Sequence, residues 1–214
     1  MILYGFSISP FVKKVLAFAS EKGVTLEQVP VAPNTDNPGF LQSSPFRKIP
    51  SFSDGEFNIS DSSAIVAYLE AKFPQPALIP AAPAERARAI WFDEFADTIV
   101  GPVLGKVFFN RVVAPVFLGQ SGDEAVAAAT ARDEVPRLFD YLEGVIADNG
   151  FLVGDALTLA DIAVTSNLIN FAHANVTVDP AVHPTLARYT AAMCARPSFA
   201  TILAAEKAML APAG

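Results

Sequence analysis

The first third of the chain alternates short apolar runs with a helical pattern. Residues 1–4 and 26–31 are mostly apolar runs of the kind that form strands. Between them, Ser9-Pro10 opens a helix, because Ser suits the cap position and Pro suits the first helical position. Gly23 is placed to end that helix. The pattern therefore predicts a strand–helix–strand unit.

Residues 47–69 predict a hairpin that leads into a helix. Residues 51–53 and 57–59 are apolar runs, and Asp54-Gly55 between them supplies the positive φ of a tight turn. A polar segment follows, and apolar side chains then recur at helical spacing at Ala64, Ile65, Tyr68 and Leu69. A helix is therefore expected to begin near Asp61.

The start of this helix is a candidate anion site. The amide groups of a first helical turn have no partner within the helix, and small polar side chains surround them here. Such residues are more often caps alone, so the pattern by itself leaves both interpretations open. Ile49-Pro50 precedes the hairpin, and a cis bond there would expose the backbone of Ile49 to an extended ligand.

A proline-rich stretch separates this part from an all-helical remainder. Its composition is that of a linker, with prolines at Pro74, Pro76, Pro80 and Pro83. No strand pattern appears after it. Helices are expected over residues 84–113, with a bend at Gly101-Pro102, over 123–149, with a bend at Pro136, and over 159–173, 184–196 and 198–210.

The predicted fold class is α/β plus all-α. Residues 1–76 are expected to form a thioredoxin-like domain with the order β-α-β-α-β-β-α. Residues 77–83 are expected to be a linker, and residues 84–214 an all-helical domain. Thr158-Leu159-Ala160-Asp161 is a capping box that predicts the start of a buried helix in this second domain.

Composition and charge exclude several classes of function. The chain has 214 residues, 52% of them hydrophobic, which predicts a globular protein. A net charge of −7 argues against a nucleic-acid partner. The single cysteine, Cys194, fits a reducing compartment, and with no secretory signal we expect a cytoplasmic location. His173 and His183 lack ligand spacing, so no metal is expected, and no uncharged run has the length and polarity of a membrane span.

The combination around the hairpin resembles the glutathione transferase superfamily. That family carries an apolar-Pro step, a hairpin and an acidic-Ser pair at a helix start, which are here Ile49-Pro50, Asp54-Gly55 and Asp61-Ser62. The capping box at residues 158–161 is also similar to one in the family's helical domain. Ser9-Pro10-Phe11 resembles the Ser-type active site of bacterial and plant classes, which are phi- or tau-like.

The resemblance implies a role for each matching residue of the glutathione site. Ser9 would donate a hydrogen bond to the thiolate of glutathione, with Ser7 as the nearest competitor. Asp61 would hold the γ-glutamyl ammonium and Ser62 the α-carboxylate. Ile49 would exchange main-chain hydrogen bonds with the cysteinyl residue. Lys48 would reach the glycyl carboxylate or remain a solvated surface lysine.

One departure from the family and one further site are also expected. The basic residue that related classes use for the glycyl end is missing here, because Asn34, Thr35 and Asp36 occupy that region. An electrophile pocket is expected to involve Phe11, Phe108 and Arg111.

The resemblance implies an enzyme that transfers the glutathione thiolate to a small electrophile. Glutathione would be a co-substrate, and no nucleic-acid or membrane partner is expected. The alternatives are a non-catalytic binding protein, a glutathione-dependent thiol oxidoreductase, a dehalogenase and an isomerase. A homodimer is also implied, with Phe46 as an anchor in the partner subunit. The alternative for Phe46 is that it folds back on its own domain.

Overall fold

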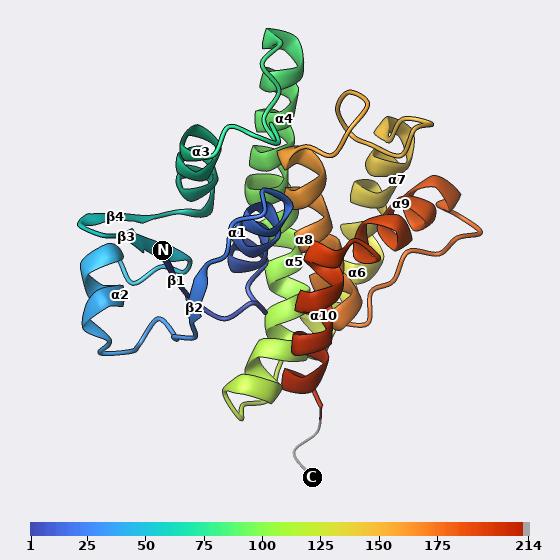
Figure 1. Cartoon of the computed structure of the whole chain (residues 1–214). Helices are drawn as coiled ribbons and strands as arrows, with labels where there is room; N and C mark the ends of the chain where they lie inside the picture. The colour runs from blue at the N-terminus through green and yellow to red at the C-terminus, as the bar shows by residue number, and fades with distance from the viewer. Residues whose placement is uncertain (212–214) are drawn as a thin grey trace.

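The computed structural model describes residues 1–211. The N-terminal part of the chain forms a small sheet flanked by helices (Figure 1). Its elements are β1 (Ile2–Tyr4), α1 (Pro10–Glu21), β2 (Glu27–Val29), α2 (Pro38–Ser43), β3 (Ser51–Asp54), β4 (Phe57–Ser60) and α3 (Ser62–Lys72). This is the predicted β-α-β-α-β-β-α order, so the thioredoxin-like fold of the first domain is confirmed. α1 begins directly after Ser9 and α3 directly after Asp61, as the capping patterns predicted.

The four strands form a mixed sheet in the order β2-β1-β3-β4. β1 runs parallel to β2 and antiparallel to β3, and β3 pairs with β4 as a hairpin. Asp54 pairs with Phe57, so the turn consists of Gly55 and Glu56, one position later than predicted. Gly55 has a φ of 62°, which is the conformation that glycine was expected to supply.

The rest of the described chain is helical, as predicted. Its elements are α4 (Pro83–Phe95), η1 (Ala96–Val100), α5 (Gly101–Phe108), η2 (Phe109–Phe117), α6 (Glu124–Asp133), α7 (Val135–Val145), α8 (Leu159–His173), α9 (Pro184–Cys194) and α10 (Pro197–Met209). The helical pattern of residues 123–149 is divided at Glu134, because Pro136 cannot continue an α-helical hydrogen-bond ladder. The domain division at residues 77–83 remains a prediction.

The first long helix contains two π-helical segments that the sequence pattern did not predict. α4, η1, α5 and η2 form one continuous helix from Pro83 to Phe117. η1 ends directly before Gly101-Pro102, where the missing N–H of proline interrupts an α-helical ladder and a π segment is a common adjustment. The expected bend therefore takes the form of a change in helical register. The helix has the length and composition of a membrane span, but α4 packs on α8 within the helical domain.

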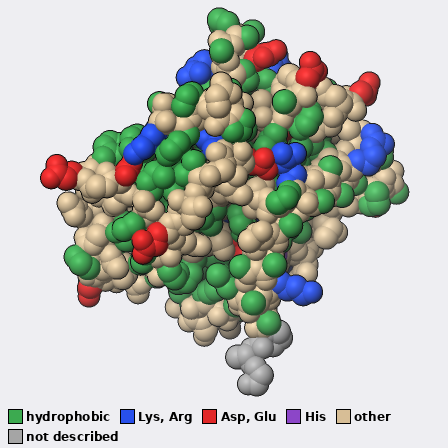
Figure 2. All heavy atoms as spheres, in the orientation of Figure 1, with side chains coloured by type: hydrophobic (Ala, Val, Ile, Leu, Met, Phe, Trp, Pro, Cys, Tyr) green, Lys and Arg blue, Asp and Glu red, His purple; other side chains and the backbone are tan. Residues whose placement is uncertain are grey.

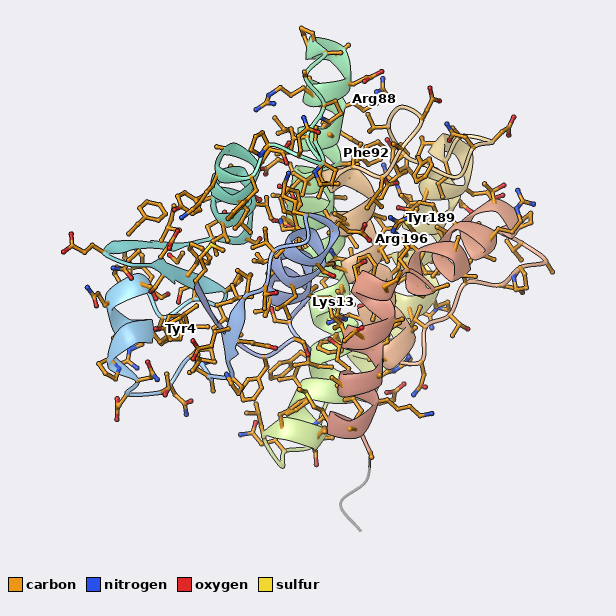
Figure 3. All side chains as sticks on the ribbon, viewed as in Figure 1. Tyr4, Lys13, Arg88, Phe92, Tyr189 and Arg196 are labelled. Carbon is orange, nitrogen blue, oxygen red and sulfur yellow. The ribbon has the colours of Figure 1, made fainter. Side chains whose placement is uncertain are left out.

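The two parts of the chain share one continuous hydrophobic core. α1 packs against both α8 and α10, so it lies between the sheet and the helical domain (Figure 1). Lys13 of α1 pairs with Glu206 of α10 at 3.0 Å, and both side chains are fully buried in this interface (Figure 3). Burial lowers the pKa of Lys13 to about 8, and the neighbouring Glu206 carboxylate partly offsets this effect.

The predicted capping box at the start of α8 is confirmed. Asp161 and Thr158 make the reciprocal contacts between the cap residue and the first helical turn. The Asp161 carboxylate also accepts from the Leu152 N–H at 2.9 Å, which ties the preceding loop to the helix. Asp161 is buried in the core, and this arrangement gives it a structural role.

Candidate active site

Ser9 lies at the start of α1 with its hydroxyl free of the helix. It occupies the N-cap position, but its side chain makes no capping hydrogen bond. The turn before it is held by the Ser9 N–H, which donates to Phe6 O at 3.1 Å. The second domain also holds this turn, because the buried Asn170 donates from Nδ2 to Ile8 O at 2.8 Å. Because no other group within residues 1–211 pairs with this hydroxyl, its position at a helix N-terminus suits it to donate to an anion.

The backbone of Ile49 lies beside this turn. The expected cis bond at Ile49-Pro50 is present. Gly5 allows the close approach, since its φ is 134° and a Cβ there would lie 2.6 Å from Val12 Cγ2 and 3.2 Å from Ile49 Cβ. The end of β1, the start of α1 and the entry to β3 therefore meet at one place.

Asp61 adopts a strained conformation at the start of α3. Its φ is 90°, and a non-glycine residue in such a region costs on the order of 1–3 kcal/mol. Its Oδ1 accepts from the N–H groups of Ser63 and Ala64 at 2.9 and 3.0 Å, which leaves Oδ2 for another partner. Within residues 1–211, no hydrogen bond uses the N–H or the hydroxyl of Ser62. The helix start thus combines one carboxylate oxygen with unpaired donors.

Two adjoining cavities meet at these elements, and Phe11 and Ile49 line both of them. The polar cavity has a volume of about 360 Å³ and is lined by Phe11, Phe46, Lys48, Ile49, Pro50, Ser60, Asp61, Ser62 and Asp97. The apolar cavity has a volume of about 540 Å³ and is lined by Phe6, Ile8, Ser9, Pro10, Phe11, Ala32, Pro33, Ile49, Phe108, Val113, Phe117 and Leu118. Among these residues of the apolar cavity, Ser9 carries the one side-chain hydrogen-bonding group.

A buried lysine joins the elements around the polar cavity. Lys14 Nζ lies 2.6 Å from Asp93 Oδ1 and 2.8 Å from Asp97 Oδ2. Ser63, in the first turn of α3, donates its hydroxyl to Asp93 at 2.7 Å. Burial raises the pKa of the Asp97 carboxyl, and the Lys14 ammonium partly offsets this. Asp97 and Asp61 both line the polar cavity, so its wall carries two carboxylates.

The structure brings together all but one of the predicted site residues. Lys48, Ile49, Asp61 and Ser62 line the polar cavity, and Ser9, Phe11 and Phe108 line the apolar one. Lys48 is exposed, so its side chain reaches the site from the rim.

Two serines near the start of the chain lie in different places. Ser7 is buried, and the cavity that it lines shares no residue with the two cavities of the site. Of the two, only Ser9 therefore lies at the site.

Arg111 is the predicted residue that lies outside both cavities. Its guanidinium pairs with Glu124 at 2.6 Å and donates to Ala174 O at 3.1 Å. The physical reason is that these two contacts hold the guanidinium away from the cavity, while Val113 of the same segment η2 lines it together with Phe108.

Sequence reasoning also missed residues that line the site. Asp97 lies in η1, four residues after Asp93, and this spacing was the available signal that both carboxylates could face α1. Phe117 lies in η2 and Phe6 in the turn after β1, and local periodicity does not place either of them. Their positions depend on how the two domains pack.

Comparison with known proteins identifies the family. The glutathione S-transferase N-terminal domain matches residues 3–77, and the glutathione S-transferase C-terminal domain matches residues 106–197. Glutathione S-transferase 3 of Zea mays is 34% identical over 164 residues, covering 74% of this chain and 72% of the relative. A glutathione S-transferase of Hyoscyamus muticus is 32% identical, with 76% and 78% covered. The solved structure of glutathione S-transferase III in apo form is 31% identical, has a TM-score of 0.81, and covers 100% of this chain and 98% of its own. The chain therefore belongs to the glutathione transferase superfamily and is a glutathione transferase.

Proposed function

We propose that the enzyme binds glutathione in the polar cavity and transfers its thiolate to an uncharged electrophile held in the apolar cavity. The observation that carries this proposal is the position of Ser9, whose uncapped hydroxyl lies at the wall of the apolar cavity while Phe11 and Ile49 line both cavities. A thiol placed at this junction has a donor on one side and the second substrate on the other. Holding the two reactants together supplies much of the rate acceleration in such reactions. Conjugation of this kind is the chemistry of detoxification.

The γ-glutamyl end of glutathione carries an ammonium and a carboxylate, and the polar cavity offers partners for both. The free Oδ2 of Asp61 and the carboxylate of Asp97 are acceptors for the ammonium. The N–H and hydroxyl of Ser62 are donors for the carboxylate at the positive end of the α3 dipole. Charge-assisted bonds of this type are worth roughly 1.5–3 kcal/mol each.

The remaining groups of glutathione fit the edge of the sheet domain. The main chain of Ile49, before the cis Pro50, is available to pair with the cysteinyl residue as an added strand. Lys48 is the cation of the polar cavity for the glycyl carboxylate. Arg47 donates to Thr35 O at 3.0 Å, so a second cation stands next to the loop that lacks the family's usual basic residue.

The role proposed for Ser9 is to stabilise the thiolate without forming a covalent bond. A free thiol titrates near 8.5, and a hydroxyl donor at a helix N-terminus favours the ionised form. The oxidoreductase alternative needs a cysteine at this place, but the only cysteine in the sequence is Cys194 in α9. Burial raises the pKa of the Cys194 thiol, which disfavours its reactive form.

The test of this proposal is a panel of electrophiles measured with glutathione on wild type and on Ser9→Ala. Neutral aryl and alkyl electrophiles should be turned over, because the apolar cavity contains no group to pair with a charge. Ser9→Ala should lower the rate on the order of 10²-fold, through loss of one donor to a developing anion. Ser7→Ala is the matched control and should keep the wild-type rate. Equal rates in Ser9→Ala and wild type would refute the assignment.

We also propose that the protein is a homodimer in the cytoplasm, with Phe46 as the anchor of each subunit. Phe46 is 84% exposed, the most of any large hydrophobic side chain in residues 1–211. A hollow of about 430 Å³ between α4 and α7 is lined by Ala84, Ala87, Arg88, Trp91 and Tyr141. Figure 3 shows Arg88 on the part of α4 that extends beyond the sheet domain.

The chemistry of this hollow supports the pairing. Trp91 is 44% exposed and stacks on Phe95, so an aromatic surface is open there. Buried aromatic side chains often dominate the energy of an interface. Hydrophobic side chains are also exposed at several places on the face in Figure 2, while basic side chains are scattered singly. A second copy of the chain fits this surface better than a nucleic acid does.

A further inference from the structure

The peptide unit that joins Ile8 to Ser9 is held at both of its polar groups. Its N–H belongs to Ser9 and donates to Phe6 O at 3.1 Å. Its C=O belongs to Ile8 and accepts from Asn170 Nδ2 at 2.8 Å. A peptide unit is planar, so holding both groups fixes its orientation and the direction in which the Cα of Ser9 leaves it. The first contact is local to the turn, but the second comes from α8 of the helical domain.

The side-chain amide of Asn170 can take only one orientation between its two neighbours. Its Nδ2 donates to the carbonyl of Ile8, which can only accept, and its Oδ1 accepts from the ammonium of Lys13, which can only donate. A flipped amide would set oxygen against the carbonyl oxygen and N–H groups against the ammonium, and both contacts would be repulsive. Asn170 is fully buried, so water does not compete with either hydrogen bond.

A buried ion pair holds Lys13 in place for this contact. Lys13 lies on α1, four residues after Ser9, and its ammonium pairs with Glu206 of α10 at 3.0 Å (Figure 3). Glu206 Oε2 also lies 2.8 Å from His173 Nε2, and His173 follows Asn170 by three residues on α8, so these two side chains share a face of the helix. A buried ion pair adds little stability compared with apolar side chains of the same volume. Its main consequence here is therefore the geometry that it imposes on Asn170.

We propose that Asn170 is a positioning residue for the glutathione reaction, which aims the Ser9 hydroxyl at the thiol through the peptide unit between Ile8 and Ser9. The inference rests on the proposed function, since it takes Ser9 as the donor to the thiolate. The hydroxyl makes no capping hydrogen bond, so the backbone that carries it sets its place. Hydrogen bonds weaken steeply as their angle departs from linear, so a small rotation of this peptide unit would misdirect the donor. Asn170 lines neither cavity of the site, so it acts through Ser9.

Hydrogen exchange of the Ser9 amide, measured by NMR on the enzyme without glutathione, tests the positioning alone. The side chain in Asn170→Leu branches at the same atom but has no hydrogen-bonding group. The Ser9 N–H should therefore exchange about twofold to tenfold faster, as expected for loss of one hydrogen bond that restrains the turn. Lys13→Met is a milder variant, because it removes one of the two partners of the Asn170 amide, and it should speed the exchange by a smaller factor.

The matched control for this measurement is Asn167→Leu. Asn167 is also buried in α8, but its amide donates to Ala163 O of its own helix and not to the turn. The control should leave the exchange rate of the Ser9 N–H unchanged. A Ser9 exchange rate that stays at the wild-type value in Asn170→Leu, or in Lys13→Met should Asn170→Leu not fold, would overturn the proposal.

The pKa of the thiol of bound glutathione tests the consequence for the reaction. In Asn170→Leu this pKa should rise by about 0.5–1, which is part of the rise that Ser9→Ala causes, and in Asn167→Leu it should equal that of wild type. In the double variant Ser9→Ala/Asn170→Leu it should equal that of Ser9→Ala, because Asn170 acts only through the hydroxyl. No rise in Asn170→Leu, or additive rises in the double variant, would overturn the positioning role alone. No rise in Ser9→Ala would refute the proposed function of Ser9, and the positioning role with it.

Discussion

Replacing Phe46 by alanine should separate the proposed dimer into monomers. An aromatic side chain has an area of roughly 200 Å², and 84% of that of Phe46 is open to solvent in the single chain. Complete burial of a phenylalanine stabilises an interface by about 1.5–3 kcal/mol. A symmetric dimer contains two such contacts, so the double loss amounts to about 3–6 kcal/mol. The dissociation constant should then rise by about 10²- to 10⁴-fold.

Analytical ultracentrifugation over a wide range of protein concentration measures this change. Phe57→Ala is the matched control, since Phe57 is also exposed but stacks on Tyr68 of its own chain. The control should dimerise as wild type does, and Trp91→Ala should weaken the dimer because Trp91 lines the hollow for the partner's anchor. A monomeric wild type would end the dimer proposal. A Phe46→Ala variant that dimerises as tightly as wild type would end the anchor proposal.

Three further predictions follow from the site and the domain interface. Asp61→Asn and Ser62→Ala should each weaken glutathione binding by about tenfold or more in titration calorimetry, and unchanged affinity in both would remove this pair from the site. Burial raises the pKa of Asp97, so on acidification its carboxylate is protonated, and glutathione binding is weakened, at a higher pH than for an exposed aspartate. In Asp97→Asn the affinity for glutathione should lack this part of the pH dependence. Burial lowers the pKa of Lys13 to about 8, so as the pH rises Lys13 loses its proton at a lower pH in the folded protein than in the unfolded one. In urea unfolding, the free energy of unfolding of wild type should therefore rise by about 3 kcal/mol relative to that of Lys13→Met between about pH 8 and 10.5. Parallel pH dependences of the two free energies would contradict this.

Local signals were sufficient to predict most of the fold. Ser9-Pro10, Asp61-Ser62 and the box at residues 158–161 are helix starts whose chemistry depends only on neighbouring residues, and the structure has helices at all three. The π segments were not predictable in this way. A π turn replaces favourable α-helical bonds, so it forms where proline or tertiary packing makes the regular ladder less favourable.

The residues that the sequence misplaced or missed at the candidate site depend on tertiary contacts. Arg111 was expected at the electrophile pocket, with Phe108, because both lie on the first long helix of the second domain, but its guanidinium pairs with Glu124. Asp97 was overlooked because its place at the polar cavity depends on Lys14, a residue of the other domain. Ser7 and Ser9 lie two positions apart in sequence, but the intervening turn directs them to different cavities. Tertiary contacts, within the helical domain for Arg111 and between the domains for Asp97, therefore decided what local pattern could not.

The pKa of the thiol of bound glutathione tests the central claim most directly. The ultraviolet absorbance of the thiolate is titrated with glutathione bound to wild type, to Ser9→Ala and to the control Ser7→Ala. One charge-assisted hydrogen bond of roughly 1.5–3 kcal/mol should lower the thiol pKa from about 8.5 to about 6.5–7.5 in wild type and in Ser7→Ala. In Ser9→Ala the thiol pKa should return toward 8.5. A thiol that titrates near 8.5 in wild type, or one whose pKa remains equally low in Ser9→Ala, would contradict the account.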